Sequence, residues 1–127
     1  MHRHLLVAAG LLALGLGHVG GASAETIAII GTGNVGSALG RRFAELGHRI
    51  VYGSRDPESA DLAPLVAASG PDAAAMTQRE AAQAAEIVVL AVPWEVVETL
   101  TQSLGDLAGR IIVDPTNPRR IAEDGLR

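Results

Sequence analysis

A strand that turns into a helix around three glycines is the feature that most constrains the fold of this chain. The run Thr26–Ile30 is apolar and rich in β-branched side chains, which is typical of a buried parallel strand. It is followed at once by Gly31, Gly33 and Gly36, in the pattern G-x-G-x-x-G. This strand–turn–helix unit predicts an α/β domain of the Rossmann type, with a doubly wound parallel sheet.

Each glycine has its own physical role in such a turn. Gly31 permits the tight turn out of the strand, Gly33 lets the backbone approach a pyrophosphate, and Gly36 lets the helix pack on the sheet. The first N–H groups of the helix have no partners within it and point at the phosphates. The alternative is a glycine turn without a ligand, because a chain with 15 glycines produces chance matches. The apolar residues that follow at helical spacing, as an amphipathic helix requires, are Val35, Ala38, Leu39, Phe43 and Leu46.

The end of the second expected strand distinguishes between the two nicotinamide cofactors. A site for NAD usually places Asp or Glu there, but this strand is followed by Ser54 and Arg55. An Arg binds a 2′-phosphate through charge-assisted hydrogen bonds, whereas a carboxylate would repel it. These residues predict NADP(H), with Ser54 and Arg55 on the 2′-phosphate. Two alternatives stay open: Arg55 is a solvated charge paired with Asp56 or Glu58, or the strand ends two residues later, at Asp56.

Apolar runs alternate with helical patterns along the rest of the chain. The expected strands are 26–30, 49–53, 73–76, 86–92 and 111–113, and the expected helices are 34–46, 62–68, 77–85 and 94–107. This order gives about five parallel strands with right-handed crossovers. Their carboxyl ends bring three loops to the cofactor, namely 31–36, 53–56 and 91–95.

Composition excludes several classes of function. The chain has 127 residues, enough for one domain, and a net charge of −4 with no basic patch, so we expect no nucleic-acid partner. It has no Cys, which excludes disulfides, thiolate metal sites and Cys nucleophiles. After the first 24 residues the only His is His48, in a loop away from the expected site. No metal site is predicted.

The first 24 residues differ in kind from the rest. A short basic start precedes an apolar stretch of twelve residues, 5–16, and Ala22-Ser23-Ala24 matches an A-x-A cleavage site. This pattern predicts a signal peptide over 1–24, a nucleotide-binding domain over 25–127, and a periplasmic or secreted protein without a membrane span after cleavage. The alternatives are an uncleaved anchor, or a start codon placed too early, which would leave the protein in the cytoplasm.

Four segments, in this order, resemble the NADP-binding domain of the coenzyme F420-dependent NADP oxidoreductase family, to which the N-terminal domain of pyrroline-5-carboxylate reductases is related. They are IGTGNVG at 30–36, GSR at 53–55, AVPWE at 91–95 and DPTNP at 114–118, and the resemblance covers about 26–118. The family continues beyond the last segment with a strand and helices that form the deazaflavin site. The expected fold therefore lacks the C-terminal acceptor part.

The resemblance also implies roles for single residues. The pyrophosphate lies over the loop of Gly31, Thr32, Gly33, Asn34, Val35 and Gly36. Thr32, Ser54 and Arg55 hold the 2′-phosphate. Val92, Pro93 and Trp94 border the nicotinamide half. For Trp94 the alternative is a residue packed for its area alone, and Asn117 either approaches the nicotinamide or simply forms a turn with Pro118.

Two functions of different class follow. The first is an oxidoreductase domain that transfers hydride between NADP(H) and a deazaflavin, coenzyme F420, or a similar small-molecule acceptor. The second is a non-catalytic module or fragment that binds NADP(H) and needs a partner chain for activity. Because the fifth strand would lie at an open edge of a small domain, we also expect a homo-oligomer or a partner subunit.

Overall fold

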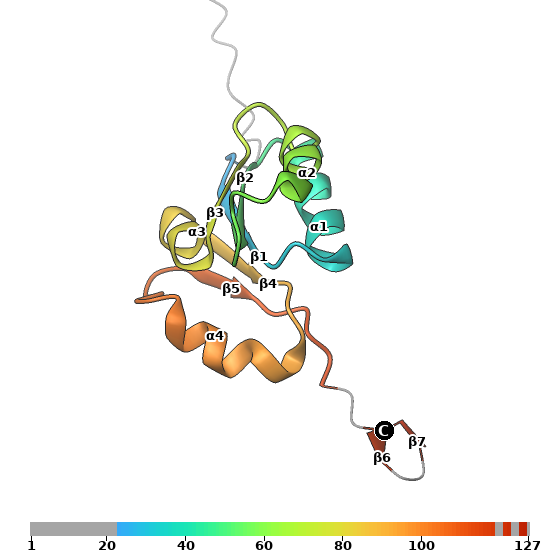
Figure 1. Cartoon of the computed structure of the whole chain (residues 1–127). Coiled ribbons are helices and arrows are strands. Elements are labelled where there is room, and N and C mark those ends of the chain that lie inside the picture. The colour runs from blue at the N-terminus through green and yellow to red at the C-terminus, as the bar shows by residue number, and fades with distance from the viewer. Residues whose placement is uncertain (1–22, 119–120, 123–124, 127) are drawn as a thin grey trace, which may run out of the picture.

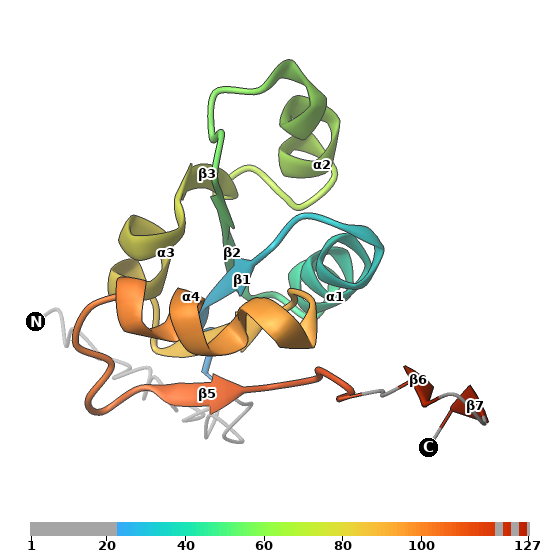
Figure 2. The same cartoon turned by 60° about the horizontal axis from the view of Figure 1, so that its bottom comes forward.

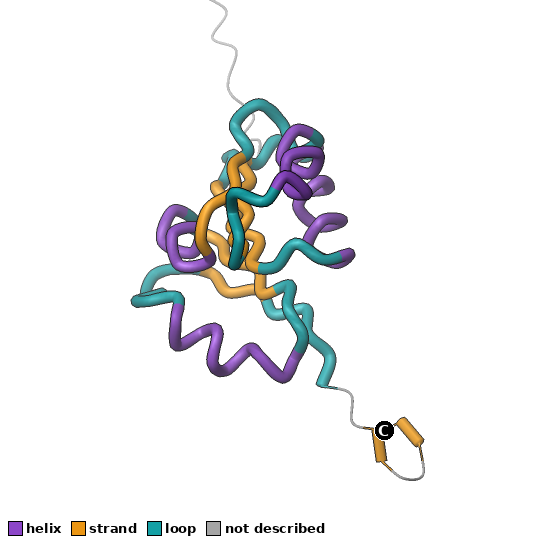
Figure 3. The backbone as a smooth tube through the Cα atoms, in the orientation of Figure 1, coloured by secondary structure: helices purple, strands orange, loops and turns teal. Residues whose placement is uncertain are grey.

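The computed structural model of the protein describes residues 23–118, 121–122 and 125–126. The predicted signal peptide, 1–24, lies outside this part except for its last two residues. Strands and helices alternate along the chain (Figures 1 and 3). The strands are β1 (Thr26–Ile30), β2 (Arg49–Ser54), β3 (Ala74–Thr77), β4 (Ile87–Leu90) and β5 (Ile111–Val113), with a short pair β6 (Ile121–Ala122) and β7 (Gly125–Leu126). The helices are α1 (Asn34–Glu45), α2 (Ala63–Ala67), α3 (Gln78–Ala84) and α4 (Val97–Ser103), with 3₁₀ turns η1 (Ala60–Leu62) and η2 (Trp94–Val96).

Five parallel strands form the main sheet in the order β3-β2-β1-β4-β5 (Figure 1). α1 and α2 pack on one face of the sheet, and α3 and α4 pack on the other (Figure 2). The strand order reverses between β1 and β4, which is the point where open α/β sheets bind ligands beyond the carboxyl ends of their strands. The doubly wound α/β fold expected from the sequence is confirmed.

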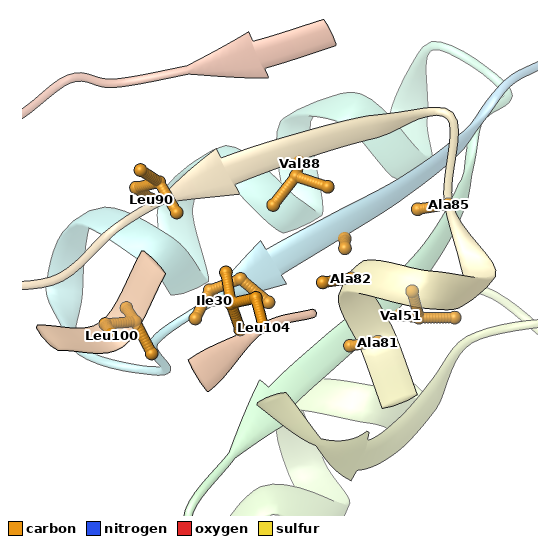
Figure 4. Packing of buried hydrophobic residues seen from close by; sticks show 10 residues of the cluster. Ile30, Val51, Ala81, Ala82, Ala85, Val88, Leu90, Leu100 and Leu104 are labelled. Carbon is orange, nitrogen blue, oxygen red and sulfur yellow. The ribbon is translucent and has the colours of Figure 1, made fainter. Parts of the chain in front are cut away.

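Aliphatic side chains on both faces of the sheet make up the core. One cluster lies under α3 and α4 and joins Ala81, Ala82, Leu100 and Leu104 to the strands (Figure 4). The other lies under α1 and α2 and is built on Ile27, Ile29, Ile50, Tyr52 and Val89. Alternate residues of β1 and β4 therefore enter opposite clusters, as strands covered on both faces require.

Tyr52 carries the polar group most deeply buried under α1. Its hydroxyl lies 2.6 Å from the hydroxyl of Ser69, which in turn donates to the carbonyl of Leu65 at 2.8 Å. Burial raises the pKa of the Tyr52 phenol. A Cβ on Gly40 of α1 would lie 2.2 Å from that hydroxyl, so the glycine makes room for the ring. This contact fixes the distance between α1 and β2.

The buried face of α1 differs from the stripe that the sequence predicts. Leu39 and Phe43 pack on the sheet, but Val35 and Leu46 are 56% and 60% exposed, and Ala38 is exposed too. The reason is that the helix touches the sheet through glycine backbone, at Gly36 and its neighbour one turn later. The apolar side chains of α1 that contact the sheet are therefore fewer than predicted, and Leu39 and Phe43 are the main ones.

The helix expected over 94–107 is also shorter than predicted. η2 covers its first residues, and α4 ends at Ser103. Gly105 follows with a φ of +86°, a left-handed conformation that stops a helix. Leu107 still packs against the core, but it does so from the following loop. Among the described helices, none has the length and apolar character needed to cross a membrane.

Candidate functional site

Gly31 joins the three loops that the sequence predicts at the site. Its N–H donates to the carbonyl of Gly53 at the end of β2, at 3.1 Å. Its φ of +105° is a left-handed conformation that favours glycine. A Cβ on Gly31 would lie 2.3 Å from the carbonyl oxygen of Ala91, just after β4. The first loop therefore crosses the end of β4 in direct backbone contact.

Gly36 holds the start of α1 against the same turn. A Cβ at this position would lie 2.2 Å from the carbonyl oxygen of Gly31 and 3.2 Å from a methyl group of Ile29. The Ser37 hydroxyl donates to the carbonyl of Thr32 at 3.1 Å and closes the loop. The packing role that the sequence predicts for Gly36 is confirmed by these contacts.

Gly33 is explained neither by backbone conformation nor by packing. Its φ is −75° and its ψ is −165°, which any residue can adopt. A Cβ on Gly33 would meet no protein atom within 4 Å. There are nine glycines from Gly31 to Gly109. Each of them except Gly33 either has a positive φ or would bring an added Cβ within 3 Å of another residue. The space beside Gly33 is therefore open to a ligand.

That space lies at the N-terminus of α1, a helix of 12 residues. Gly33 is the N-cap, no side chain caps the helix, and its first turn has no acidic residue. The structure gives the N–H groups of Asn34, Val35 and Gly36 no acceptor within the described part of the chain. Unpaired N–H groups and the positive end of the helix dipole favour an anion at this position.

Ser54 and Arg55 follow directly at the carboxyl end of β2. The Ser54 hydroxyl accepts from the N–H of Asp56 at 3.0 Å, and Asp56 lies in a turn closed by the N–H of Ser59 at 3.2 Å. β2 ends at Ser54, so Asp56 does not take the strand-end position. The Arg55 side chain is exposed. It forms no ion pair with either Asp56 or Glu58, since the described residues hold one ion pair, Arg42–Glu45.

Val92, Pro93 and Trp94 lie beyond β4 and next to the glycine turn. A Cβ on Gly31 would come within 3.1 Å of a Val92 methyl group, so the start of this loop packs against the glycine turn. Pro93 is the N-cap residue of η2, and the Trp94 side chain is 49% exposed. Packing for area alone does not explain a tryptophan that is half in water.

Other residues that the sequence singles out have local roles. The Asp114 carboxylate accepts from the N–H and the hydroxyl of Thr116, which caps the turn after β5 and lowers the pKa of Asp114. His48 accepts from the N–H of Glu25 at 3.1 Å, at the opposite end of the sheet from the glycine turn. Asn117 is exposed. Within the described residues no group of His, Asp and Glu side chains could hold a metal ion.

The structure adds one neighbour that sequence reasoning missed. Ser54 is paired in register with Thr77, so the start of α3 lies beside Ser54 and Arg55. The hydroxyl of Thr77 is already used in a capping box, in which it accepts from the N–H of Glu80 at 3.2 Å. A groove of about 850 Å³ lies between α2 and β3 and includes no residue of the glycine turn.

Comparison with known proteins supports this geometry. Residues 26–118 match the model of the family described as NADP oxidoreductase, coenzyme F420-dependent. The F420-dependent NADP reductase of Methanothermobacter thermautotrophicus is 35% identical over 99 residues, and the metalloreductase STEAP3 of Rattus norvegicus is 33% identical over 96 residues. The matches cover 72% and 75% of this chain, but only 43% and 18% of those relatives.

Two solved structures share the fold. A protein of Arthrobacter sp. FB24, provisionally described as an F420-dependent NADP reductase, superposes with a TM-score of 0.66 at 33% identity. The likeness covers 79% of this chain and 48% of that one. An imine reductase variant from Myxococcus stipitatus, in complex with NAD⁺, superposes with a TM-score of 0.58 at 26% identity, over 74% of this chain and 32% of that one.

Proposed function

Because the chain belongs to the coenzyme F420-dependent NADP oxidoreductase family, we propose that it binds NADP(H) at the turn between β1 and α1 and takes part in hydride transfer to a deazaflavin or a similar acceptor. Oxidoreductase domains of this family depend on NADP, which supports NADP(H) as the cofactor. The acceptor is a finer proposal, since the chain spans less than half of the reductases that it matches.

The open space beside Gly33 is the observation that carries the proposal. A pyrophosphate there would receive N–H groups from the uncapped start of α1, and the absent side chain would let it approach the backbone. At Gly31 and Gly36 a side chain would collide with the protein itself. At Gly33 a side chain would collide only with a ligand bound in the open space. A dinucleotide fits this requirement.

Arg55 supports NADP(H) over NAD(H). Its guanidinium is exposed and has no carboxylate partner among the described residues, so it is available to a 2′-phosphate. Ser54 stands at the strand end, where an NAD site usually has an acid. Thr32, in the neighbouring loop, is half-buried and is the third residue that we propose near this phosphate.

Bound NADPH supplies the hydride, and the protein supplies position and electrostatics. Val92 packs beside Gly31 on the β4 side, and Trp94 of the same loop is half-exposed. In the proposed complex Val92, Pro93 and Trp94 would orient the nicotinamide ring and shield it from water. The three side chains whose pKa is displaced within the described residues are Tyr52, Glu80 and Asp114, and none belongs to the glycine turn. Hydride transfer between two cofactors requires no such group.

The proposal is tested by following the absorbance of NADPH in the presence of oxidised F420, FMN or FAD. If the protein is an oxidoreductase, it consumes NADPH faster than the protein-free control with at least one acceptor. With the same acceptor it consumes NADH more slowly than NADPH. Saturable NADPH binding without consumption would instead favour the second candidate, a binding module that needs a partner chain. Failure to bind either nucleotide would contradict both.

Export is a separate proposal, supported by the basic start, the apolar stretch and the A-x-A site of residues 1–24. N-terminal sequencing of protein recovered from the periplasm or medium should give Glu25 as the first residue. Recovery from the cytoplasm with Met1 intact would contradict export.

A further inference from the structure

The peptide unit between Thr32 and Gly33 is the part of the glycine turn that has the most freedom to rotate. A residue without a Cβ adopts positive and negative φ about equally well, so this unit has more than one accessible orientation. A Cβ on Gly33 would meet no protein atom within 4 Å, so packing does not restrict the rotation. The glycine that leaves space for a ligand therefore also leaves its own N–H without a fixed direction, unless another group holds it.

Ser37, in the first turn of α1, holds this peptide unit in one orientation. Its hydroxyl donates to the carbonyl oxygen of Thr32 at 3.1 Å, and both residues are half-buried. The N–H of Ser37 also donates to the carbonyl of Gly33 at 2.9 Å, which is the first hydrogen bond of the helix. Ser37 thus binds two consecutive carbonyl groups, one through its side chain and one through its backbone.

The direction of the Thr32 carbonyl determines the direction of the next N–H. The described part of the chain has no cis peptide bond. In a planar trans peptide the C=O and N–H groups point in opposite directions. Because the carbonyl of Thr32 points at Ser37, the N–H of Gly33 points away from Ser37, and it has no acceptor within the described residues. This N–H therefore joins the unpaired N–H groups at the start of α1 as a donor for an anion.

We propose that Ser37 is a positioning residue for the dinucleotide. Its hydroxyl holds the Thr32 carbonyl toward α1 and thereby keeps the Gly33 N–H directed at the pyrophosphate. The inference rests on the proposed binding of NADP(H) at the turn between β1 and α1. Ser37 acts through Gly33, whose N–H has its direction set before the nucleotide arrives, so that less conformational freedom is lost on binding.

Removal of the hydroxyl should disturb this one donor and leave the rest of the turn in place. The close contacts that seat the turn lie between Gly31 and the carbonyl of Ala91, and between Gly36 and the carbonyl of Gly31. Neither contact involves the side chain of Ser37. Without the hydroxyl the nucleotide has to order the Gly33 peptide as it binds, and the cost of that ordering weakens its affinity.

Calorimetric titration of NADPH into the full chain with Ser37→Ala tests the proposal. The affinity should fall about 3- to 10-fold, which corresponds to the net contribution of one hydrogen bond. Ser37→Thr keeps the hydroxyl and should bind like the natural protein, whereas Ser37→Val has the shape of Thr without the hydroxyl and should bind like Ser37→Ala. Ser103→Ala is the control: its hydroxyl also donates to a backbone carbonyl, that of Leu100 at 2.6 Å, but on α4. This control should leave the affinity unchanged.

Titration with two further ligands separates positioning of the pyrophosphate from a general disturbance of the site. Ser37→Ala should weaken the binding of NADPH and NAD⁺ by the same factor, because both contain a pyrophosphate. It should leave the binding of 2′-AMP unchanged, because 2′-AMP has the 2′-phosphate but no pyrophosphate. Arg55→Ala should give the opposite pattern, in which NADPH and 2′-AMP bind more weakly and NAD⁺ binds as before.

An unchanged affinity of Ser37→Ala for NADPH would overturn the role of Ser37. Equal affinities of Ser37→Thr and Ser37→Val for NADPH, or an equal loss for 2′-AMP in Ser37→Ala, would overturn it too. In these three cases the natural protein still binds NADPH, so the proposed function stands. If the natural protein binds no NADPH, the proposed function fails, and the role of Ser37 fails with it.

Discussion

Both sides of the glycine turn contain glycine, but for different reasons. The inner side packs against the protein, and the outer side faces open space. On the inner side, Gly31 and Gly36 would each drive a Cβ to 2.2–2.3 Å from a backbone oxygen. On the outer side, Gly33 meets nothing within 4 Å, and Arg55 has no ion-pair partner among the described residues. Gly31 and Gly36 are explained by contacts within the protein. Gly33 and Arg55 have no such contacts among the described residues, as expected of residues that bind a ligand.

The largest effect that this contrast predicts is on stability. Gly36→Ala should lower the free energy of unfolding by about 3 kcal/mol, because the added methyl group collides with backbone that cannot rotate away. In a domain of this size that corresponds to a fall in Tm of roughly 12–24 °C. Thermal unfolding followed by circular dichroism measures it. The matched control, Gly33→Ala, should lose no more than about 1 kcal/mol, because Ala is a poorer N-cap than Gly. Equal losses in both variants would contradict the contrast.

A smaller effect is expected at Arg55. Arg55→Ala should weaken NADP⁺ binding by about 10- to 100-fold, since a charge-assisted hydrogen bond contributes about 1.5–3 kcal/mol. Binding of NAD⁺ should stay the same, because that nucleotide has no 2′-phosphate. Calorimetric titration with both nucleotides checks the prediction. Arg42→Ala, which removes an exposed guanidinium on α1 that is already paired with Glu45, serves as the control. An equal loss of affinity for NADP⁺ and NAD⁺ would show that Arg55 does not bind the 2′-phosphate.

The smallest effect concerns the corner after β3, next to Ser54. Hydrogen bonds from Thr77 hold the pKa of the Glu80 carboxyl below its usual value. A carboxyl with a lowered pKa in the folded state contributes stability above its unfolded pKa and loses it as the pH falls through the folded value. The capping box should therefore weaken below about pH 4.

Urea unfolding at neutral and acidic pH tests this. Glu80→Gln should reduce the difference in stability between the two conditions. Glu98→Gln, which changes an exposed carboxylate on α4, should leave the difference as it is in the natural protein. A Glu80→Gln variant with the full acid dependence would show that the capping box makes no contribution.

The sequence predicts the fold well because its signals are local and strong. β1 and β5 have the expected bounds, and α3 begins at the expected capping box. The face of α1 is misjudged because side-chain periodicity cannot show that the helix approaches the sheet through glycine. The length of α4 is overestimated because the left-handed conformation of Gly105 depends on the following turn.

The sequence predicts which residues form the candidate site, but not the contacts that distinguish their roles. The motif assigns a purpose to each of three glycines, and the contacts of Gly31 and Gly36 agree with that assignment. No sequence pattern could show that Gly33 lacks a neighbour, because that depends on where the ends of β2 and β4 lie. For the same reason the closeness of Thr77 to Ser54 emerges only from the pairing of β2 with β3.

Calorimetric titration of NADPH into the natural protein and into Gly33→Val shows whether the pyrophosphate lies beside Gly33. The natural protein should bind one NADPH per chain with a saturable isotherm. The variant should bind at least 100-fold more weakly, a loss of about 2.7 kcal/mol, while its Tm falls by no more than about 8 °C, the effect of a poorer N-cap. Equal affinity in the two proteins, or no binding by well-folded natural protein, would contradict the claim that the space beside Gly33 holds the pyrophosphate.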